Sequence, residues 1–314
     1  MYILAALFLD ALLGDPKRLP HPVGGVGGIV RFWEKRLYPN PNKGQGGMLL
    51  CLAVLGTTVA MAGLLLLCAS FYKWLYELTT LYLLYAALAW RSLKDQSLPV
   101  VQALFGDNMD SARVALSHIV GRDTEKLDRT DIIRASIETV GENFIDGVFS
   151  VLFFMTLGYM CEGVAGATLA AWLFKAVNTL DSMVGHDDER YRDFGRAAAR
   201  LDDALNFIPA RLGGVVILVA GLCLGCPFLR GVQVFLRDRK KHKSPNSAHG
   251  ESAFAGLLGV RLGGGAFYDG VFEERPLIGY DDFREPDPFD ILRAHSILDA
   301  AVGLSSLLVI FFLF

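Results

Sequence analysis

The fold is decided by an uncharged stretch of sequence, Met48-Leu-Leu-Cys-Leu-Ala-Val-Leu-Gly-Thr-Thr-Val-Ala-Met-Ala-Gly-Leu-Leu-Leu-Leu-Cys-Ala-Ser-Phe-Tyr72. Its length exceeds the roughly 20 residues that an α-helix needs to cross the hydrocarbon core of a bilayer. A run of this kind without a single Asp, Glu, Lys or Arg is typical of a membrane-spanning helix. The stretch therefore predicts that this part of the chain is surrounded by lipid.

Composition extends this prediction to the rest of the chain. Of the 314 residues, 53% are hydrophobic and only 20% are charged, whereas soluble domains carry about 25% charged residues. We predict an all-α, polytopic helical membrane protein with about five apolar segments and polar amphipathic helices between them. It would form a single integral membrane domain over residues 1–314 and cross the cell membrane several times. The apolar segments are residues 48–72, 74–90, 148–174, 214–229 and 297–314.

An unusually polar stretch, residues 175–211, lies between two of these segments. Carboxylates, carboxamides and cations recur there at helical spacing, ahead of a proline, Pro209, that would end or bend the helix. The residues are Lys175, Asn178, Asp181 and Ser182 in the first part and Arg200, Asp202, Asp203, Asn206 and Arg211 in the second. Unpaired charge is costly beside a membrane, so we interpret the stretch as part of a functional site. The alternative is a solvated loop with ordinary surface charge.

Three carboxylates precede the third apolar segment at intervals of four residues. Glu138, Glu142 and Asp146 therefore share one face of a helix, with Asn143 beside them. Like charges on one face repel each other, so a cation is expected nearby. Oxygen-only ligands suit Mg²⁺, which proteins usually hold together with phosphate and water, better than Zn²⁺. The alternative is an exposed acidic stripe that water solvates.

A further candidate site follows the basic run Arg237-Asp-Arg-Lys-Lys-His-Lys243. The sequence Ser244-Pro-Asn-Ser247 opens a helix rich in small residues and offers hydroxyls, a carboxamide and free N–H groups. Such a turn is suited to receive a phosphate group, and Arg211 is predicted to lie near it in space. The alternative is a turn whose Ser and Asn residues only cap the helix.

Several classes of function are not supported. The chain contains no dinucleotide-binding or P-loop motif, and its net charge of −3 does not indicate a nucleic-acid partner. Cys223 and Cys226 lie in an apolar run, where two small buried side chains explain them without redox chemistry. The glycine- and proline-rich stretch 15–28 predicts an irregular loop.

The positions of the polar clusters conflict if every apolar segment crosses the membrane once. Loops 14–47, 91–147 and 230–296 would then lie on one side, and residues 175–213 on the other. Because the clusters must meet to form one site, we predict that residues 148–180 form a broken helical hairpin that turns near Glu162 and Gly163, or that the polar stretch enters the membrane.

The motifs taken together resemble one family over nearly the whole chain. They are Leu13-Gly-Asp-Pro with Pro20-His-Pro, Ser136-Ile-Glu-Thr-Val-Gly-Glu-Asn143, Asn178-Thr-Leu-Asp-Ser-Met-Val, Ala199-Arg-Leu-Asp-Asp, Ile208-Pro-Ala-Arg-Leu and Ser244-Pro-Asn-Ser. In this order they are similar to adenosylcobinamide-phosphate synthase, the CbiB/CobD membrane enzyme of cobalamin biosynthesis. Ala248 and His249 depart from the pattern that we expect for this family, which puts a functional role for His249 in doubt.

The resemblance implies an amide-forming ligase that uses ATP and Mg²⁺. It would join a propionate carboxylate of adenosylcobyric acid, a cobalt corrinoid, to the amine of (R)-1-aminopropan-2-ol phosphate. Further copies of the chain, or other membrane enzymes of the cobalamin pathway, are the protein partners to consider. The alternative from another class is a membrane sensor similar to AmpE, or a transporter of an anionic ligand, without ligase activity.

The candidate residues divide by role. The expected catalytic residues are Glu138, Glu142, Asp146, Lys175, Asp181 and Asp202, and the expected metal ligands are Glu142 and Asp146. The expected substrate-binding residues are Asn143, Asn178, Ser182, Arg200, Asp203, Asn206, Arg211, Ser244, Asn246 and Ser247.

Overall fold

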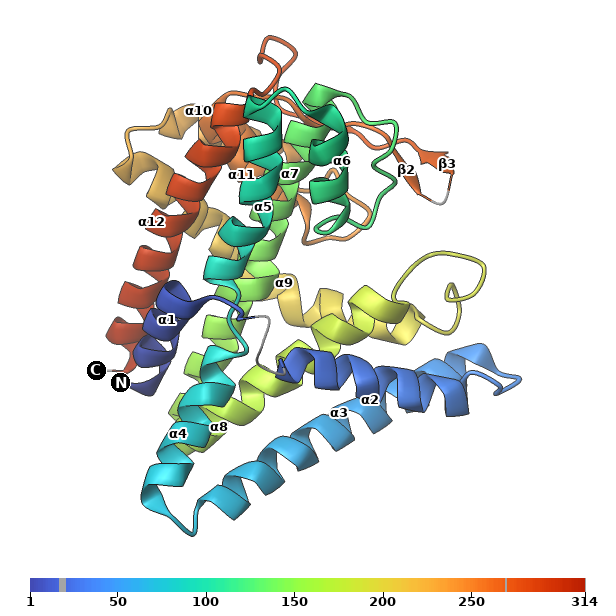
Figure 1. Cartoon of the computed structure of the whole chain (residues 1–314), viewed down its shortest axis with the longest axis vertical. Helices are drawn as coiled ribbons and strands as arrows, with labels where there is room; N and C mark the ends of the chain where they lie inside the picture. The colour runs from blue at the N-terminus through green and yellow to red at the C-terminus, as the bar shows by residue number, and fades with distance from the viewer. Residues whose placement is uncertain (17–20, 269, 314) are drawn as a thin grey trace. The chain divides into compact units, whose positions relative to one another are not determined.

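The computed structural model describes residues 1–16, 21–268 and 270–313 and confirms the all-α class (Figure 1). The helices are α1 (Tyr2–Leu13), α2 (Pro22–Leu37), α3 (Lys43–Ala69), α4 (Lys73–Tyr85), α5 (Trp90–Phe105), α6 (Met109–Ser117), α7 (Arg129–Phe144), the π-helical turn η1 (Ile145–Phe149), α8 (Ser150–Val184), α9 (Arg196–Cys223), α10 (Phe228–Asp238), α11 (Ala248–Leu258) and α12 (Pro288–Leu313). Four short strands are described: β1 (Leu262–Gly263), β2 (Ala266–Tyr268), β3 (Val271–Glu273) and β4 (Leu277–Ile278). Strand β1 pairs with β4 and β2 with β3, both antiparallel.

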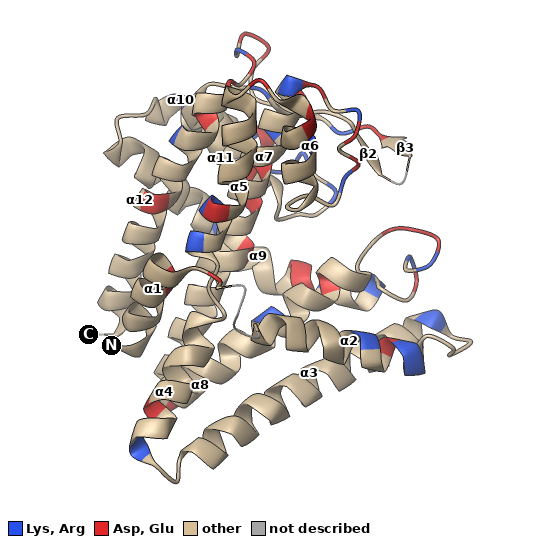
Figure 2. Cartoon of the chain, viewed as in Figure 1, with Lys and Arg blue, Asp and Glu red and all other residues tan. Residues whose placement is uncertain are grey.

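Among the described residues, four helical stretches are long and apolar enough to cross a membrane. They are Lys43–Ala69, Arg129–Val184, Arg196–Cys223 and Pro288–Leu313. After Lys43 at its start, α3 carries no charged side chain, as Figure 2 shows. The expected segment 74–90 is different, because α4 has only 13 residues. At 1.5 Å per residue it is about 20 Å long, which is shorter than the roughly 30 Å hydrocarbon core.

Helix α8 is a hairpin of two arms rather than one rod. Its backbone leaves helical geometry at Glu162 (φ −139°, ψ 29°) and at Gly163 (φ 60°, ψ −146°), a conformation that glycine adopts most easily. The rings of Phe154 and Phe174 stack with centroids 5.1 Å apart, whereas 20 residues of straight helix would separate them by about 30 Å. The predicted broken hairpin is therefore confirmed.

Two compact units make up the chain, and each is described by itself. Unit 1 consists of Met1–Ala89, Ser150–Asn206 and Val309–Phe314, and unit 2 of Trp90–Phe149 and Phe207–Leu308. In unit 1, α2 and α3 lie side by side (Figure 1), and both pack on α8. In unit 2, α11 packs on α7 and α10, and α5 packs on α6 and α7. The expected single domain over residues 1–314 stays a prediction.

Two local predictions differ from the structure, the second of them in part. The glycine-rich residues that follow Pro22 lie inside α2, where they begin a helix instead of continuing a loop. Pro209 does not end its helix, since α9 runs from Arg196 through it to Cys223; the alternative that it bends the helix stays a prediction. Residues 17–20, which include Pro20 of the quoted motif, lie outside the described part of the chain.

Gly158 provides a test of the hairpin. A Cβ atom at this position would lie 2.3 Å from the carbonyl oxygen of Gly166 on the other arm. We expect Gly158→Ala to lower the free energy of unfolding by about 1–3 kcal/mol, because the arms would have to separate. In the matched control Gly63→Ala, the new Cβ atom meets nothing within 4 Å, so stability should be kept or raised slightly. Thermal unfolding in detergent measures both, and equal midpoints would contradict close packing of the arms.

Candidate functional site

Helices α7 and α11 of unit 2 approach each other through two glycines. A Cβ atom at Gly250 would lie 2.2 Å from the carbonyl oxygen of Gly141. Only glycine therefore fits at this crossing. The contact brings together two clusters that are about 100 residues apart in sequence, because the Ser247 hydroxyl donates to Glu142 Oε1 at 3.1 Å. The acidic stripe and the Ser244–Ser247 turn thus lie against each other.

Both carboxylate oxygens of Glu138 have partners. Arg122 donates to Oε2 at 2.7 Å, and the backbone N–H of Gly263 donates to Oε1 at 2.7 Å. The Glu138 side chain is only 6% exposed, so removal of Arg122 would leave a buried charge without compensation. Glu138 thereby joins α7 to the loop before α7 and to β1. Its expected catalytic role stays a prediction.

Glu142 and Asp146 are the two expected metal ligands, and this role stays a prediction. Both side chains are half-buried, as is Asn143 between them, and Asp146 lies in η1. Single π-helical turns inside α-helices are frequent at functional sites. No group of three or more His, Cys, Asp and Glu side chains placed to hold a metal is present among the described residues. A pair of carboxylates still matches the way proteins hold Mg²⁺, since substrate phosphate and water complete its six ligands.

Glu251 is an acidic residue of this region that sequence reasoning missed. It lies in α11, one helical turn after Ser247, and is 5% exposed. Burial, together with the charges of Glu138 and Glu142, raises the pKa of Glu251 well above its ordinary value. The group therefore favours its protonated form, which can hold a proton beside the acidic stripe. The signal in the sequence that could have identified Glu251 is its position four residues after Ser247, which places it one helical turn away. The small residues around it gave no further indication.

The Ser244–Ser247 turn is not an ordinary helix cap. Ser247 precedes α11, yet its side chain makes no capping hydrogen bond and binds Glu142 instead. Arg211 lies beside the turn, as predicted: its Nη1 atom is 3.4 Å from Asn246 Oδ1. Asn246 is buried, and its backbone N–H donates to the Ser244 hydroxyl oxygen at 3.3 Å.

His249 follows this turn and is 1% exposed. Its Nδ1 lies 3.1 Å from the carbonyl oxygen of Asn246, and no described group forms a hydrogen bond with its Nε2. Burial, and then the positive charges of Arg211, Arg239 and Lys240, lower the pKa of His249 to about 4. The imidazole is therefore held neutral among cations.

The remaining predicted residues lie in unit 1. In α9, the Asn206 amide donates to Asp202 Oδ2 at 3.0 Å, and the Ser150 hydroxyl donates to Asn206 Oδ1 at 2.7 Å. In α8, the Ser182 hydroxyl donates to the carbonyl oxygen of Asn178 at 2.8 Å, so it is occupied by its own helix. Lys175, Asp202 and Asn206 are buried, Asn178, Asp181 and Asp203 are half-buried, and Ser182 and Arg200 are exposed.

The loop between α8 and α9 is attached to α2 through Glu34. Tyr191 Oη donates to Glu34 Oε1 at 2.7 Å, and Arg190 donates to the same oxygen at 2.8 Å. Burial and this carboxylate raise the pKa of Tyr191 to about 12. These contacts hold in place a loop that otherwise carries mostly exposed charge.

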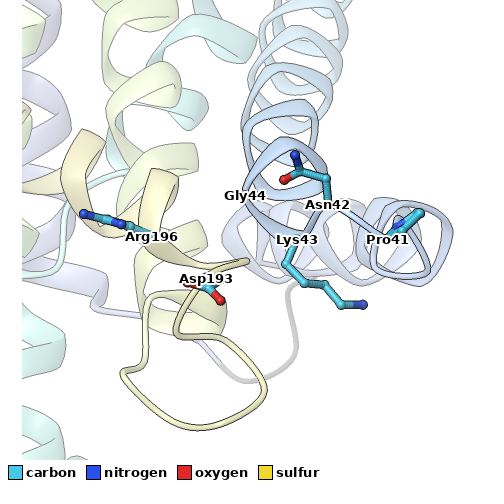
Figure 3. Close-up of a pocket in the computed structure, with 6 residues that line it drawn as sticks. All are labelled: Pro41, Asn42, Lys43, Gly44, Asp193 and Arg196. Atoms are coloured by element: carbon cyan, nitrogen blue, oxygen red, sulfur yellow. The ribbon is translucent and has the colours of Figure 1, made fainter.

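A pocket of about 690 Å³ lies beside this loop (Figure 3). Its lining is Pro41, Asn42, Lys43, Gly44, Asp193 and Arg196. Figure 3 shows the Arg196 side chain directed away from Lys43, and the Lys43 ammonium group donates to the carbonyl oxygen of Tyr38 at 2.6 Å. The two cations therefore do not converge on one point.

A second cavity, of about 620 Å³, lies in unit 2. It is lined by the loop before α7, including Arg122, and by Phe267 and Phe272 of the β2–β3 hairpin. Arg122 belongs both to this wall and to the pair with Glu138. The cavity thus borders the acidic stripe.

Comparisons with known proteins agree with these motifs. The chain matches the family model described as CobD/Cbib protein over residues 3–298. A Desulfotalea psychrophila protein named cobalamin biosynthesis protein CobD is 39% identical over 323 aligned positions, which cover 99% of this chain and 97% of the relative. Proteins of the same name from Halalkalibacterium halodurans and Pelobacter propionicus are 42% and 43% identical and cover 88% and 90% of this chain; each alignment covers 85% of the relative. No solved structure matches the chain at a significant level.

His249 predicts a pH dependence of stability. Because the pKa of the folded state, about 4, lies below the ordinary value near 6.5, the unfolded state binds more protons between these values. The free energy of unfolding should therefore fall by ~3 kcal/mol from this group as the pH falls from 6.5 to 4, with its full contribution present above pH 6.5. In His249→Asn this part of the dependence should be absent.

Denaturant unfolding at several pH values between 4 and 7 measures the effect. The matched control is His118→Asn at an exposed position, which should leave the wild-type curve unchanged. The same slope in wild type and His249→Asn would contradict a buried neutral imidazole.

Proposed function

The chain belongs to the CobD/Cbib family of cobalamin biosynthesis proteins, and we propose that it is the ligase that forms adenosylcobinamide phosphate. In this proposal, an amide bond joins a propionate carboxylate of adenosylcobyric acid to (R)-1-aminopropan-2-ol phosphate, with ATP and Mg²⁺. We further propose that the protein crosses the cell membrane several times. Four helical stretches of sufficient length and apolarity support this.

The reaction needs an activated carboxylate, because a carboxylate is a poor electrophile. A propionate oxygen attacks the γ-phosphorus of ATP and ADP leaves, which gives an acyl phosphate. The ammonium group of the second substrate loses one proton and attacks the acyl carbon. Inorganic phosphate leaves and takes the second proton of the nitrogen. The site must therefore hold two phosphate-bearing substrates, offset their charge and accept one proton.

The contact between Ser247 and Glu142 supports this function best. It places a turn of hydroxyls, amide and backbone N–H groups beside a row of carboxylates. The reaction needs both kinds of group in one site, since the first binds phosphate oxygens and the second holds a metal ion.

Glu142 and Asp146 are the proposed Mg²⁺ ligands. They fit because both are half-buried oxygen donors, whereas Glu138 already accepts hydrogen bonds on both oxygens. Mg²⁺ offsets the negative charge of the transferred phosphoryl group when it is bound. Asn143 lies between the two ligands in sequence and is proposed to bind substrate.

The Ser244–Ser247 turn, with Arg211, is proposed to bind a substrate phosphate. Arginine suits this role because its planar fork can hold two phosphate oxygens, whereas lysine offers a point charge. Ser244, Asn246 and Ser247 would contribute the remaining donors. In this assignment, Glu142 and Asp146 serve the metal-bound nucleotide.

The polar residues of unit 1 are proposed to serve the same reaction. Lys175, Asp181 and Asp202 are proposed as catalytic residues that stabilise charge or accept the amine proton. The proposed substrate-binding residues of this unit are Asn178, Ser182, Arg200, Asp203 and Asn206. Burial of Lys175 and of the Asp202–Asn206 pair supports these assignments, because buried ionisable groups next to membrane-spanning segments are often functional.

Turnover is the direct test of this function. The purified protein in detergent, given the corrinoid acid, the phosphorylated amine, ATP and Mg²⁺, should produce the amide together with equal amounts of ADP and phosphate. Mass spectrometry of the corrinoid measures the product. Binding of the corrinoid or of the amine without product, in folded protein, would instead favour a sensor or transporter of anionic ligands.

The metal assignment gives a separate prediction. Glu142→Gln and Asp146→Asn keep the shape of each side chain but remove its charge, so turnover should fall by about 10²-fold or more and the Mg²⁺ requirement should rise. The matched control is Asp110→Asn, in which the carboxylate is 95% exposed and pairs with Arg113, a neighbour on α6. Unchanged turnover and Mg²⁺ dependence in both site variants would mean that the stripe is ordinary surface charge.

A further inference from the structure

The basic residues at the end of α10 divide into two groups. Arg237 and Lys241 pair with Asp238 at 2.7 and 2.9 Å, and Lys243 pairs with Glu273 at 3.0 Å. Arg239 and Lys240 behave differently, because they form no ion pair within the described part of the chain. Arg211 of α9 likewise lacks a carboxylate partner among the described residues. The positive charges of all three residues lower the pKa of His249.

Two buried polar atoms lie in the same region without a hydrogen-bond partner among the described residues. They are Nε2 of His249 and Nε of Arg239. A buried donor or acceptor without a partner costs about 1–3 kcal/mol, and native proteins contain few such atoms. Arg211 and Arg239 are half-buried and have no counterion among the described residues, so their like charges add to this cost, whereas Lys240 is exposed. Both features would be relieved by one anion bound among these side chains.

We propose that Arg211, Arg239, Lys240 and His249 form a binding site for a phosphate group, which needs no metal ion. A phosphate dianion matches the site better than a carboxylate, since its charge offsets more of the three cations and its oxygens accept from several donors. The buried amide of Asn246, 3.4 Å from Arg211, lies at the same place. A bound dianion would let His249 gain a proton on Nε2 and donate it to a phosphate oxygen.

This site extends the phosphate-binding role proposed above for the Ser244–Ser247 turn and therefore rests on that part of the proposed function. It adds three residues to which no role has been assigned: Arg239, Lys240 and His249. The surroundings of the two proposed sites also distinguish two kinds of phosphate group. A metal-free phosphate monoester belongs among the cations, and a metal-bound polyphosphate belongs at Glu142 and Asp146.

Membrane topology alone does not explain these residues. Basic residues that only mark the cytoplasmic side of a membrane stay hydrated, whereas atoms of Arg239 and His249 are buried. The phosphate could still come from either of two sources, a soluble phosphorylated substrate or a lipid headgroup. The second is open because α10 exposes Leu229 and Leu236, at 76% and 60%, as an interfacial helix does.

Equilibrium dialysis with radiolabelled inorganic phosphate tests the site without ATP, Mg²⁺ or corrinoid. The full-length protein in a non-ionic detergent with EDTA should bind phosphate saturably. Arg239→Met should weaken binding by about tenfold or more, because a charged hydrogen bond is lost. His249→Asn should also weaken it, since Asn can keep the contact with the Asn246 carbonyl group but lacks Nε2. The matched control Arg230→Met removes a cation of α10 that is paired with Asp282, and it should leave the affinity within about twofold.

Thermal unfolding distinguishes a binding role from a structural one. Phosphate should raise the midpoint of the wild type and of Arg230→Met, because a ligand stabilises the state that binds it. Without phosphate, Arg239→Met and His249→Asn should unfold at or above the wild-type midpoint, since cation repulsion or an unpaired atom is removed. If Arg239→Met does not fold, Arg239→Lys keeps the charge and should still bind more weakly than wild type.

Nanodiscs separate the two phosphate sources. Competition by phosphatidylglycerol nanodiscs, but not by phosphatidylcholine nanodiscs, would identify a lipid headgroup as the ligand, and absence of competition would identify a soluble phosphate. The proposal is overturned if folded wild type binds no phosphate, or if Arg239→Met and His249→Asn bind it as the wild type does. Phosphate binding without amide formation would overturn the ligase function but not this site.

Discussion

No side-chain carbon fits where α7 and α11 cross, because a Cβ atom at residue 250 would lie 2.2 Å from the Gly141 carbonyl oxygen. The crossing sets the distance between the acidic stripe and the turn that precedes α11. A second close contact, in which a Cβ atom at Gly256 would lie 2.7 Å from the Gly231 Cα atom, brings α10 against the same helix. Since α11 is packed on both α7 and α10, the groups that it carries are buried and cannot be solvated by water.

Burial constrains the ionisable side chains of unit 2 that lie around α11. Glu138 is paired with Arg122 and accepts a second hydrogen bond from a backbone N–H group. At Glu251, burial and the charges of Glu138 and Glu142 outweigh the attraction of Arg275 and Arg122, so the protonated form is favoured. His249 lies among cations and favours the neutral form. Apart from the Arg122–Glu138 pair, the carboxylates of the acidic stripe and the cations around His249 occupy neighbouring parts of one unit. This arrangement suits the proposed reaction, in which a metal-bound phosphate and a metal-free phosphate are held apart.

In unit 1 the corresponding constraint is the turn of α8 at Glu162 and Gly163. Its arms approach through Gly158 and Gly166, where small residues let helix backbones come close in lipid. Because the second arm returns beside the first, the Lys175 end of the hairpin lies at the level of its Ser150 end. The bond from Ser150 to Asn206 places α9 at the same level. Polar residues from three segments of sequence are therefore collected in one part of this unit.

The sequence by itself determined the features that depend on neighbours along the chain: the uncharged span 48–72, the spacing of Glu138, Glu142 and Asp146, and the break at Gly163. Such features follow from hydrophobicity, helical periodicity and the conformational freedom of glycine. The tertiary structure decided which polar groups are paired and which are buried. Glu138 is occupied by the N–H group of Gly263, which is 125 residues away in sequence, and Glu251 and His249 owe their protonation states to burial between helices. No local pattern encodes these contacts, because burial and long-range charge arise only when distant segments pack together.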